Sequence, residues 1–146
     1  MSIILVVGTG QLGSRYIQGL ATCSSFLEIW NLDPSLTSLN IAKERWESVG
    51  GSSSIHRINW TQDYSEIPNI IDLAIVATNA DVRSHVLKVI LRNCSIRYLV
   101  LEKVLVQSSY QLEELLHTVQ SVDGAWVNTS RRMNTWHKKF KMYPQF

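Results

Sequence analysis

The feature that most constrains this chain is a glycine-rich turn, Gly8-Thr9-Gly10-Gln11-Leu12-Gly13, between segments of different periodicity. The residues before it, Ile3 to Val7, are all apolar, which is typical of a strand buried on both faces. The residues after it place apolar side chains at helical spacing. In this strand-turn-helix context, GxGxxG predicts a turn that binds the pyrophosphate of a dinucleotide at the start of the helix. A tight turn without a ligand is the alternative interpretation.

Each glycine of this turn has its own predicted role. Gly8 permits the tight turn, Gly10 lets the backbone approach the pyrophosphate, and Gly13 lets the helix pack close to the strand. Gln11 and Leu12 complete the predicted phosphate site. Free backbone N–H groups and the positive end of the helix dipole stabilise the phosphate charge there.

An acidic residue, Asp33, follows the second predicted strand at the spacing where a carboxylate binds the adenosine ribose hydroxyls. This carboxylate would repel the 2′-phosphate of NADP, and Pro34, Ser35 and Leu36 provide no arginine to bind it. The pattern therefore predicts NAD as the cofactor and disfavours NADP. Asp33 could instead cap a helix or shape a turn before Pro34, and both roles could coexist.

Apolar runs of strand length alternate with amphipathic segments along the rest of the chain. This alternation predicts an α/β fold, a doubly wound Rossmann fold with a mainly parallel six-stranded sheet in the order 3-2-1-4-5-6 and helices on both faces. The predicted strands are Ile3–Val7, Leu27–Trp30, Ile55–Ile58, Leu73–Ala77, Tyr98–Leu101 and Ala125–Val127. Three helix faces are expected to be buried: Leu12, Tyr16, Ile17, Leu20 and Ala21; Val82, Val86, Val89 and Ile90; and Leu112, Leu115, Leu116 and Val119. A weaker helix from Ser35 to Val49 should end at Gly50 and Gly51, which tolerate a left-handed cap.

Composition argues against several other classes of protein. The chain has 146 residues, the usual size of one domain, and a formal net charge of +2, so nucleic-acid binding is not expected. Polar residues interrupt every apolar run before the ~20 residues needed to cross a membrane. Cys23 and Cys94 lack metal-site spacing and are expected to be buried thiols in a reducing compartment. We therefore expect a cytoplasmic protein without a metal site.

Two further stretches resemble the Gfo/Idh/MocA oxidoreductases, the family of glucose-fructose oxidoreductase and inositol dehydrogenase. Where that family has a strand ending in Thr-Pro, this chain has Thr78-Asn79, and where it has Glu-Lys-Pro, this chain has Glu102-Lys103-Val104. Val104 lacks the fixed φ with which proline shapes the family's turn. The resemblance implies that Thr78, Asn79 and Glu102 contact the cofactor. It also implies that Lys103 is the catalytic lysine that contacts the reacting sugar hydroxyl, the alternative being an ordinary Glu-Lys pair at a strand end.

The end of the chain differs in character from the rest. Residues 1–130 are expected to form the Rossmann domain, and 131–146 a basic, aromatic tail leading toward a second domain absent from this chain. The resemblance implies that Arg131 or Arg132 contacts an anionic sugar or sugar nucleotide, although a solvated basic helix is an equal alternative. Apolar side chains in the tail predict a homodimer: Trp136, Phe140, Met142, Tyr143 and Phe146.

Three functional interpretations follow. We favour the NAD-binding part of a sugar or sugar-nucleotide oxidoreductase, as in family members of surface polysaccharide synthesis, inactive without its second domain. The others are a stand-alone NAD-binding or redox-sensing module and an interaction subunit, since fold alone does not imply catalysis. Histidines give no further guide: His56, His85 and His117 fall on segments remote from the predicted reaction edge, and His137 lies in the tail.

Overall fold

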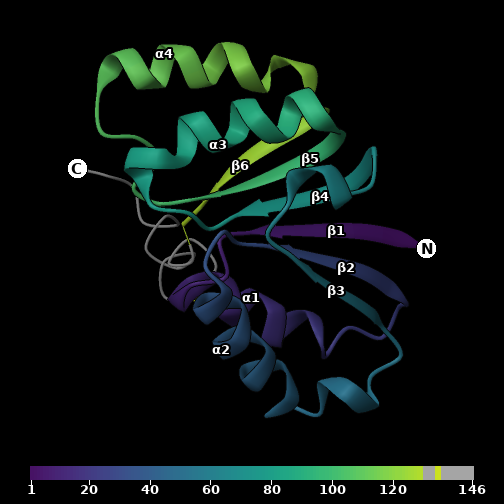
Figure 1. The fold of residues 1–146 in the computed structure, drawn as a ribbon. Coiled ribbons are helices and arrows are strands. Elements are labelled where there is room, and N and C mark those ends of the chain that lie inside the picture. Colours follow the sequence, from purple (N-terminus) through teal and green to yellow (C-terminus); the bar gives the residue numbers. More distant parts are fainter. Residues whose placement is uncertain (130–133, 136–146) are drawn as a thin grey trace.

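The computed structural model describes residues 1–129 and 134–135, which form one parallel sheet between two layers of helices (Figure 1). The strand order is β3-β2-β1-β4-β5-β6, so the predicted Rossmann fold is confirmed. The strands are β1 (Ser2–Val7), β2 (Leu27–Leu32), β3 (Arg57–Thr61), β4 (Ile70–Val76), β5 (Ser95–Glu102) and β6 (Gly124–Asn128). The helices are α1 (Gln11–Leu20), α2 (Leu36–Glu47), α3 (Ala80–Asn93) and α4 (Ser109–Thr118), with short 3-10 helices η1 (Gly51–Ser53), η2 (Tyr64–Glu66) and η3 (Val119–Ser121).

The sheet separates two hydrophobic cores. Helices α1 and α2 cover one face, and α3 and α4 cover the other (Figure 1). Successive side chains of β1 point to opposite faces, so Leu5 and Val7 join the core beneath α3 and α4, while Ile4 and Val6 join the core beneath α1 and α2. This burial on both faces is the reason that β1 is an unbroken apolar run.

The carboxyl edge of the sheet is organised around β1, where the strand order reverses. β1 pairs in parallel with β2 on one side and with β4 on the other. The Gly8 N–H donates to the Leu32 carbonyl (2.9 Å), and the Ala77 N–H donates to the Val7 carbonyl (2.8 Å). These bonds bring together the turns that follow β1, β2 and β4, which is where ligands bind in open α/β sheets.

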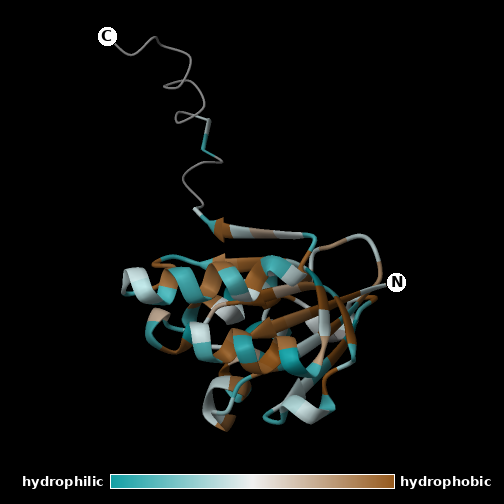
Figure 2. Ribbon diagram, turned by 90° about the horizontal axis from the view of Figure 1, so that it is seen from above, coloured by the Kyte–Doolittle hydropathy of each residue, from teal (hydrophilic) through white to brown (hydrophobic). Residues whose placement is uncertain are grey.

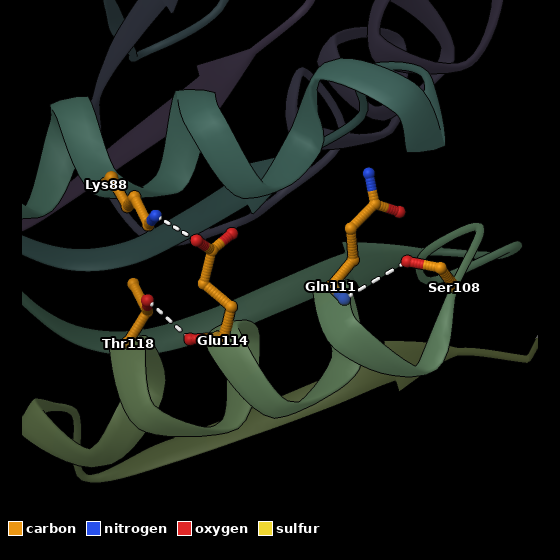
Figure 3. A network of polar contacts seen from close by, with 5 residues as sticks. All are labelled: Lys88, Ser108, Gln111, Glu114 and Thr118. Carbon is orange, nitrogen blue, oxygen red and sulfur yellow. Dashed lines mark hydrogen bonds and ion pairs between the residues drawn. The ribbon is translucent and has the colours of Figure 1, made fainter.

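Polar contacts attach α4 to the outside of α3. Lys88 on α3 forms an ion pair with Glu114 on α4 (Figure 3). At the start of α4, the Ser108 hydroxyl accepts a hydrogen bond from the Gln111 N–H (3.2 Å) and satisfies one of the unpaired donors of the first turn. These contacts join α4 to α3 and stabilise its first turn.

The predicted helix faces are wrong at four positions. Figure 2 shows hydrophobic and hydrophilic residues side by side along the helices. Four of the apolar residues predicted to be buried are exposed. Leu12 and Val82 are exposed because they lie in the first turns of α1 and α3, at the carboxyl edge of the sheet. Leu112 and Leu116 are exposed because α4 packs at the periphery and buries a narrow stripe around Leu115.

The third strand begins later than predicted. It covers Arg57–Thr61 rather than Ile55–Ile58. Ile58 and Trp60 contact the core beneath α1 and α2, whereas Ile55 is out of phase with them and lies 57% exposed before the strand. β3 lies at the edge of the sheet and has one neighbouring strand, so its apolar pattern is short. The sequence therefore predicted the start of the strand too early, at Ile55.

The prediction of two buried thiols holds for one cysteine. Cys94 is buried at the end of α3, and burial raises the pKa of its thiol to about 11. Cys23 is exposed, because α1 ends at Leu20 and Cys23 lies in the turn that follows, where no helix face is buried. The predicted left-handed stop after α2 is confirmed at Gly50, whose φ is +77°.

We predict that Gly13→Ala strongly destabilises the fold. A Cβ at Gly13 would lie 1.8 Å from the Gly8 carbonyl oxygen, a backbone atom that cannot move away cheaply. We expect a loss of about 3 kcal/mol or more in the free energy of unfolding, measured by urea denaturation. Gly19→Ala, in the same helix, is the control: a Cβ there meets no atom within 4 Å, and alanine should stabilise the helix by about 0.5–1 kcal/mol. Equal unfolding midpoints for the two variants would contradict this account.

Candidate functional site

The glycine turn between β1 and α1 has the backbone geometry of an anion site. Gly8 has φ +84°, a conformation that favours glycine. A Cβ added to Gly10 would meet nothing within 4 Å, so this part of the backbone faces open space. Helix α1 has no side-chain cap at its start and no acidic residue in its first turn. Its first N–H groups and helix dipole are therefore available to a negatively charged ligand.

A cavity of about 450 Å³, which we call the first cavity, opens beside this turn. Its walls come from the carboxyl ends of β1, β2 and β4, from η2 and from the first turns of α3. The structure thus brings together residues that the sequence analysis singled out from distant segments. The predicted cofactor residues that line the first cavity are Gly8, Gly10, Asp33, Thr78 and Asn79.

Asp33 stabilises the glycine turn by hydrogen bonds and also forms part of the wall of the first cavity. One carboxylate oxygen, Oδ2, accepts hydrogen bonds from the Thr9 N–H (2.7 Å) and the Thr9 hydroxyl (3.2 Å). The other, Oδ1, accepts from the Ser35 N–H (2.8 Å). The cap of α2 is the hydroxyl of Ser35, not Asp33. A carboxylate has about four acceptor sites, so Asp33 can still accept a hydrogen bond from a ligand hydroxyl.

Besides apolar wall residues, two side chains with polar groups, Tyr64 and His85, line the first cavity without having been predicted to belong to the site. Tyr64 comes from η2, and burial, followed by the nearby charge of Asp33, raises the pKa of its phenol. An aromatic ring in a cavity wall can pack against a flat base. His85 was placed by the sequence on a helix remote from the reaction edge, but it also lines this cavity. The sequence signal for Tyr64 is weak, because η2 is a single short turn after β3.

A second cavity of about 350 Å³ lies beside the first turns of α1 and the carboxyl ends of β5 and β6. It is lined by Leu12, Arg15, Tyr16, Glu102, Lys103 and Asn128. The predicted residues Glu102 and Lys103 are therefore brought together with Leu12. Lys103 is exposed at the end of β5. Gln11 lines neither cavity, and its side-chain oxygen accepts a hydrogen bond from Arg45 (2.8 Å).

Glu102 is held by partners far from it in the sequence. Its side chain is buried, and Oε1 accepts hydrogen bonds from the Tyr16 hydroxyl and the Asn128 amide, the latter at 2.8 Å. Its predicted contact with the cofactor stays a prediction. Tyr16 and Asn128 fix this carboxylate from α1 and β6, and no single segment of sequence contains all three residues.

The hydroxyl of Tyr16 keeps its proton to a higher pH than an ordinary tyrosine does. Burial, with smaller contributions from the hydrogen bond to Glu102 and its charge, raises the pKa of Tyr16 to about 12. The phenol is therefore a neutral donor to Glu102 at physiological pH. Because the phenol is not ionised, it donates a hydrogen bond to Glu102 and does not repel its carboxylate.

The remaining residues predicted for the ligand site and the tail lie near the end of the chain. Arg131, Arg132, His137 and the aromatic tail residues lie outside the described residues. Within residues 1–129 and 134–135, no three His, Cys, Asp or Glu side chains are placed to hold a metal ion. In the same part of the chain, no helix is both long and apolar enough to span a membrane.

We predict that Tyr16 makes stability pH-dependent above pH 10. Its pKa is about 10 in the unfolded chain and about 12 in the folded protein. The contribution of the bound proton is thus complete below about pH 10 and is lost as the pH rises toward about 12. Tyr16→Phe should flatten the loss of unfolding free energy between about pH 10 and about pH 12 in urea titrations. Tyr110→Phe, at an exposed position of α4, is the control, and identical slopes for wild type and Tyr16→Phe would refute the prediction.

Comparison with solved structures finds the same fold in larger proteins. The chain aligns over 97% of its length with 40% of myo-inositol dehydrogenase from Lactobacillus casei, in complex with NAD(H) and myo-inositol, at TM-score 0.72 and 16% identity. It aligns over 96% of its length with 42% of a Gfo/Idh/MocA family oxidoreductase from Vibrio cholerae, at TM-score 0.71 and 19% identity. For biliverdin reductase from Synechocystis, in complex with biliverdin and NADP+, the shares are 95% and 41%, at TM-score 0.65 and 17% identity.

No protein-family model matches the chain, and no curated protein matches it in sequence. At 16–19% identity, the solved structures show a shared fold. The chain spans about 40% of the length of these neighbours. The resemblance of the sequence motifs to the Gfo/Idh/MocA oxidoreductases is therefore confirmed at the level of the fold of their Rossmann part.

Proposed function

We propose that this chain is the NAD-binding part of an oxidoreductase that acts on a sugar or sugar nucleotide. The proposal rests mainly on one observation: three features lie together around the first cavity. They are the start of α1, which has no side-chain cap, the Asp33 carboxylate and the turn at Thr78. The first element binds a phosphate, the second a ribose hydroxyl, and the third closes the opposite wall. This combination matches the needs of a dinucleotide better than those of a simple anion.

The two cavities suggest which way the dinucleotide lies. Its pyrophosphate would bind at the N–H groups of the α1 start, between the cavities. The adenosine would occupy the first cavity, with its ribose beside Asp33 and its base near Tyr64. The nicotinamide half would then point toward the second cavity, where Glu102 and Lys103 lie. When bound, the nicotinamide ring supplies hydride transfer.

Lys103 has the position and chemistry to act on a substrate hydroxyl. Its exposed ammonium, at the carboxyl end of β5, can donate a hydrogen bond to the hydroxyl oxygen, and its neutral amine can accept the hydroxyl proton. Glu102 lies beside it as a fixed negative charge held by Tyr16 and Asn128. Arg131 or Arg132 would bind an anionic group of the substrate, as their place in the sequence suggests.

The structural neighbours support the class of reaction but differ in cofactor. One was solved with NAD(H) and myo-inositol, and another with NADP+ and biliverdin. The choice of NAD for this chain therefore rests on Asp33, whose buried carboxylate would face a 2′-phosphate. We propose the cytoplasm as the location, surface polysaccharide synthesis as the setting, and residues 131–146 as a self-association segment.

The exposure of Lys103 bears on activity. A substrate next to an exposed lysine has few walls to orient it or to exclude water. We therefore expect negligible sugar oxidation by these 146 residues alone. A stand-alone NAD-binding module is the second candidate function, and the same exposure of Lys103 favours it.

We predict that the chain binds NADH more tightly than NADPH and that Asp33→Asn reduces this preference. Asparagine keeps an acceptor for the Thr9 or Ser35 N–H while removing the charge that repels a 2′-phosphate. Calorimetric titration should show a preference of about tenfold or more in wild type, and a much smaller one in the variant. Asp123→Asn is the control, since Asp123 is an exposed residue at the opposite edge of the sheet. Equal affinities for the two cofactors in wild type would remove Asp33 from this role.

A further inference from the structure

A buried arginine links the two halves of the candidate site. Arg83 lies in the first turns of α3, and its side chain is 1% exposed. Nη2 donates a hydrogen bond to the Thr78 carbonyl, in the turn after β4. Nη1 donates to the carbonyls of Glu102 (2.5 Å), Val104 and Leu105 (2.8 Å), in the turn after β5. One guanidinium therefore bridges the ends of two adjacent strands.

The chemistry of these contacts requires an arginine. Burial lowers the pKa of Arg83 and the charge of Glu102 raises it, yet a guanidinium stays protonated in proteins. All of its hydrogen-bond partners are backbone carbonyls, so its two Nη groups shape the two turns, while Nε has no partner among the described residues. The planar fork of a guanidinium can reach carbonyls on both sides, whereas the ammonium of lysine directs its donors from one atom.

The turn after β5 is the segment that needs such support. It carries Lys103, and none of its residues 103–106 is a proline that would fix the backbone φ. The carbonyls of Val104 and Leu105 both accept hydrogen bonds from Arg83. By contrast, the turn after β4 is also held by the bond from the Ala77 N–H to β1 (2.8 Å). Loss of Arg83 should therefore release the Lys103 turn more than the Thr78 turn.

We propose that Arg83 is a positioning residue, which holds the Lys103 turn in register with the Thr78 turn and so aligns the second cavity with the first. The inference rests on the proposed function, because the register matters only if one dinucleotide spans both cavities. Arg83 then acts through Lys103 and Glu102, and touches neither cofactor nor substrate. Its effect should be confined to the nicotinamide half of the cofactor.

The test compares wild type with Arg83→Lys, and with Arg83→Gln if the lysine variant fails to fold. Arg92→Lys, an exposed position in the last turn of the same helix, is the matched control. Hydrogen–deuterium exchange is measured on residues 103–107 and on β1 without ligand. Calorimetry then gives the affinities for NADH and for ADP-ribose, which lacks the nicotinamide.

The proposal predicts about tenfold faster exchange at 103–107 in the Arg83 variant, with unchanged exchange in β1. It also predicts about tenfold weaker NADH binding, while ADP-ribose binding and the Arg92 control stay close to wild type. Unchanged exchange at 103–107, faster exchange throughout the protein, or equal losses for both ligands would overturn it. If wild type binds neither ligand, the proposed function fails, and the exchange result alone decides whether Arg83 positions this turn.

Discussion

The close approach of α1 to the end of β1 is the constraint on which the rest of the site depends. No side chain fits between Gly13 and the Gly8 carbonyl, where a Cβ would lie 1.8 Å from the oxygen. This contact places the free N–H groups of α1 at the carboxyl edge of the sheet, directly above the point where the strand order reverses. Both cavities depend on the same geometry, because the glycine turn lines the first and the first turns of α1 line the second.

The polar groups around this contact serve the fold and the ligand site together. Asp33 binds the backbone of Thr9 and of Ser35, which stabilises the two turns that would hold phosphate and ribose. On the other side, Glu102 is fixed by Tyr16 and Asn128. Both carboxylates are buried and held by hydrogen bonds from the protein, so they are fixed in place before a ligand binds. Such preorganisation reduces the cost of ordering a site upon binding.

Sequence reasoning succeeded where a short segment carries its own physical signal. The run before Gly8 identified a strand buried on both faces, and the spacing of Gly8, Gly10 and Gly13 identified the turn. The order of the strands followed from the crossover rule. The sequence predicted β3 less accurately, because an edge strand has a weak apolar pattern. It also misplaced Leu12 and Val82, whose helical spacing is the same whether they face a core or a cavity.

The contacts that organise the second cavity had no local signal. Tyr16, Glu102 and Asn128 come from α1, β5 and β6, and their hydrogen bonds span 86 and 112 positions of sequence. Arg83 reads in the sequence as one polar residue of an amphipathic helix, yet it is buried among four backbone carbonyls. Partners of this kind emerge only when the strands are placed side by side, so three-dimensional structure was needed to find them.

We propose above all that the glycine turn holds the pyrophosphate of a nicotinamide dinucleotide. Calorimetric titration of NADH into wild type and Gly10→Val tests it most directly, because a Cβ at Gly10 meets no protein atom within 4 Å and would enter only the space of the ligand. The account predicts saturable binding to wild type, no detectable binding to the variant, and similar urea midpoints for both proteins. Absence of binding to wild type, or equal binding by a folded Gly10→Val protein, would contradict it.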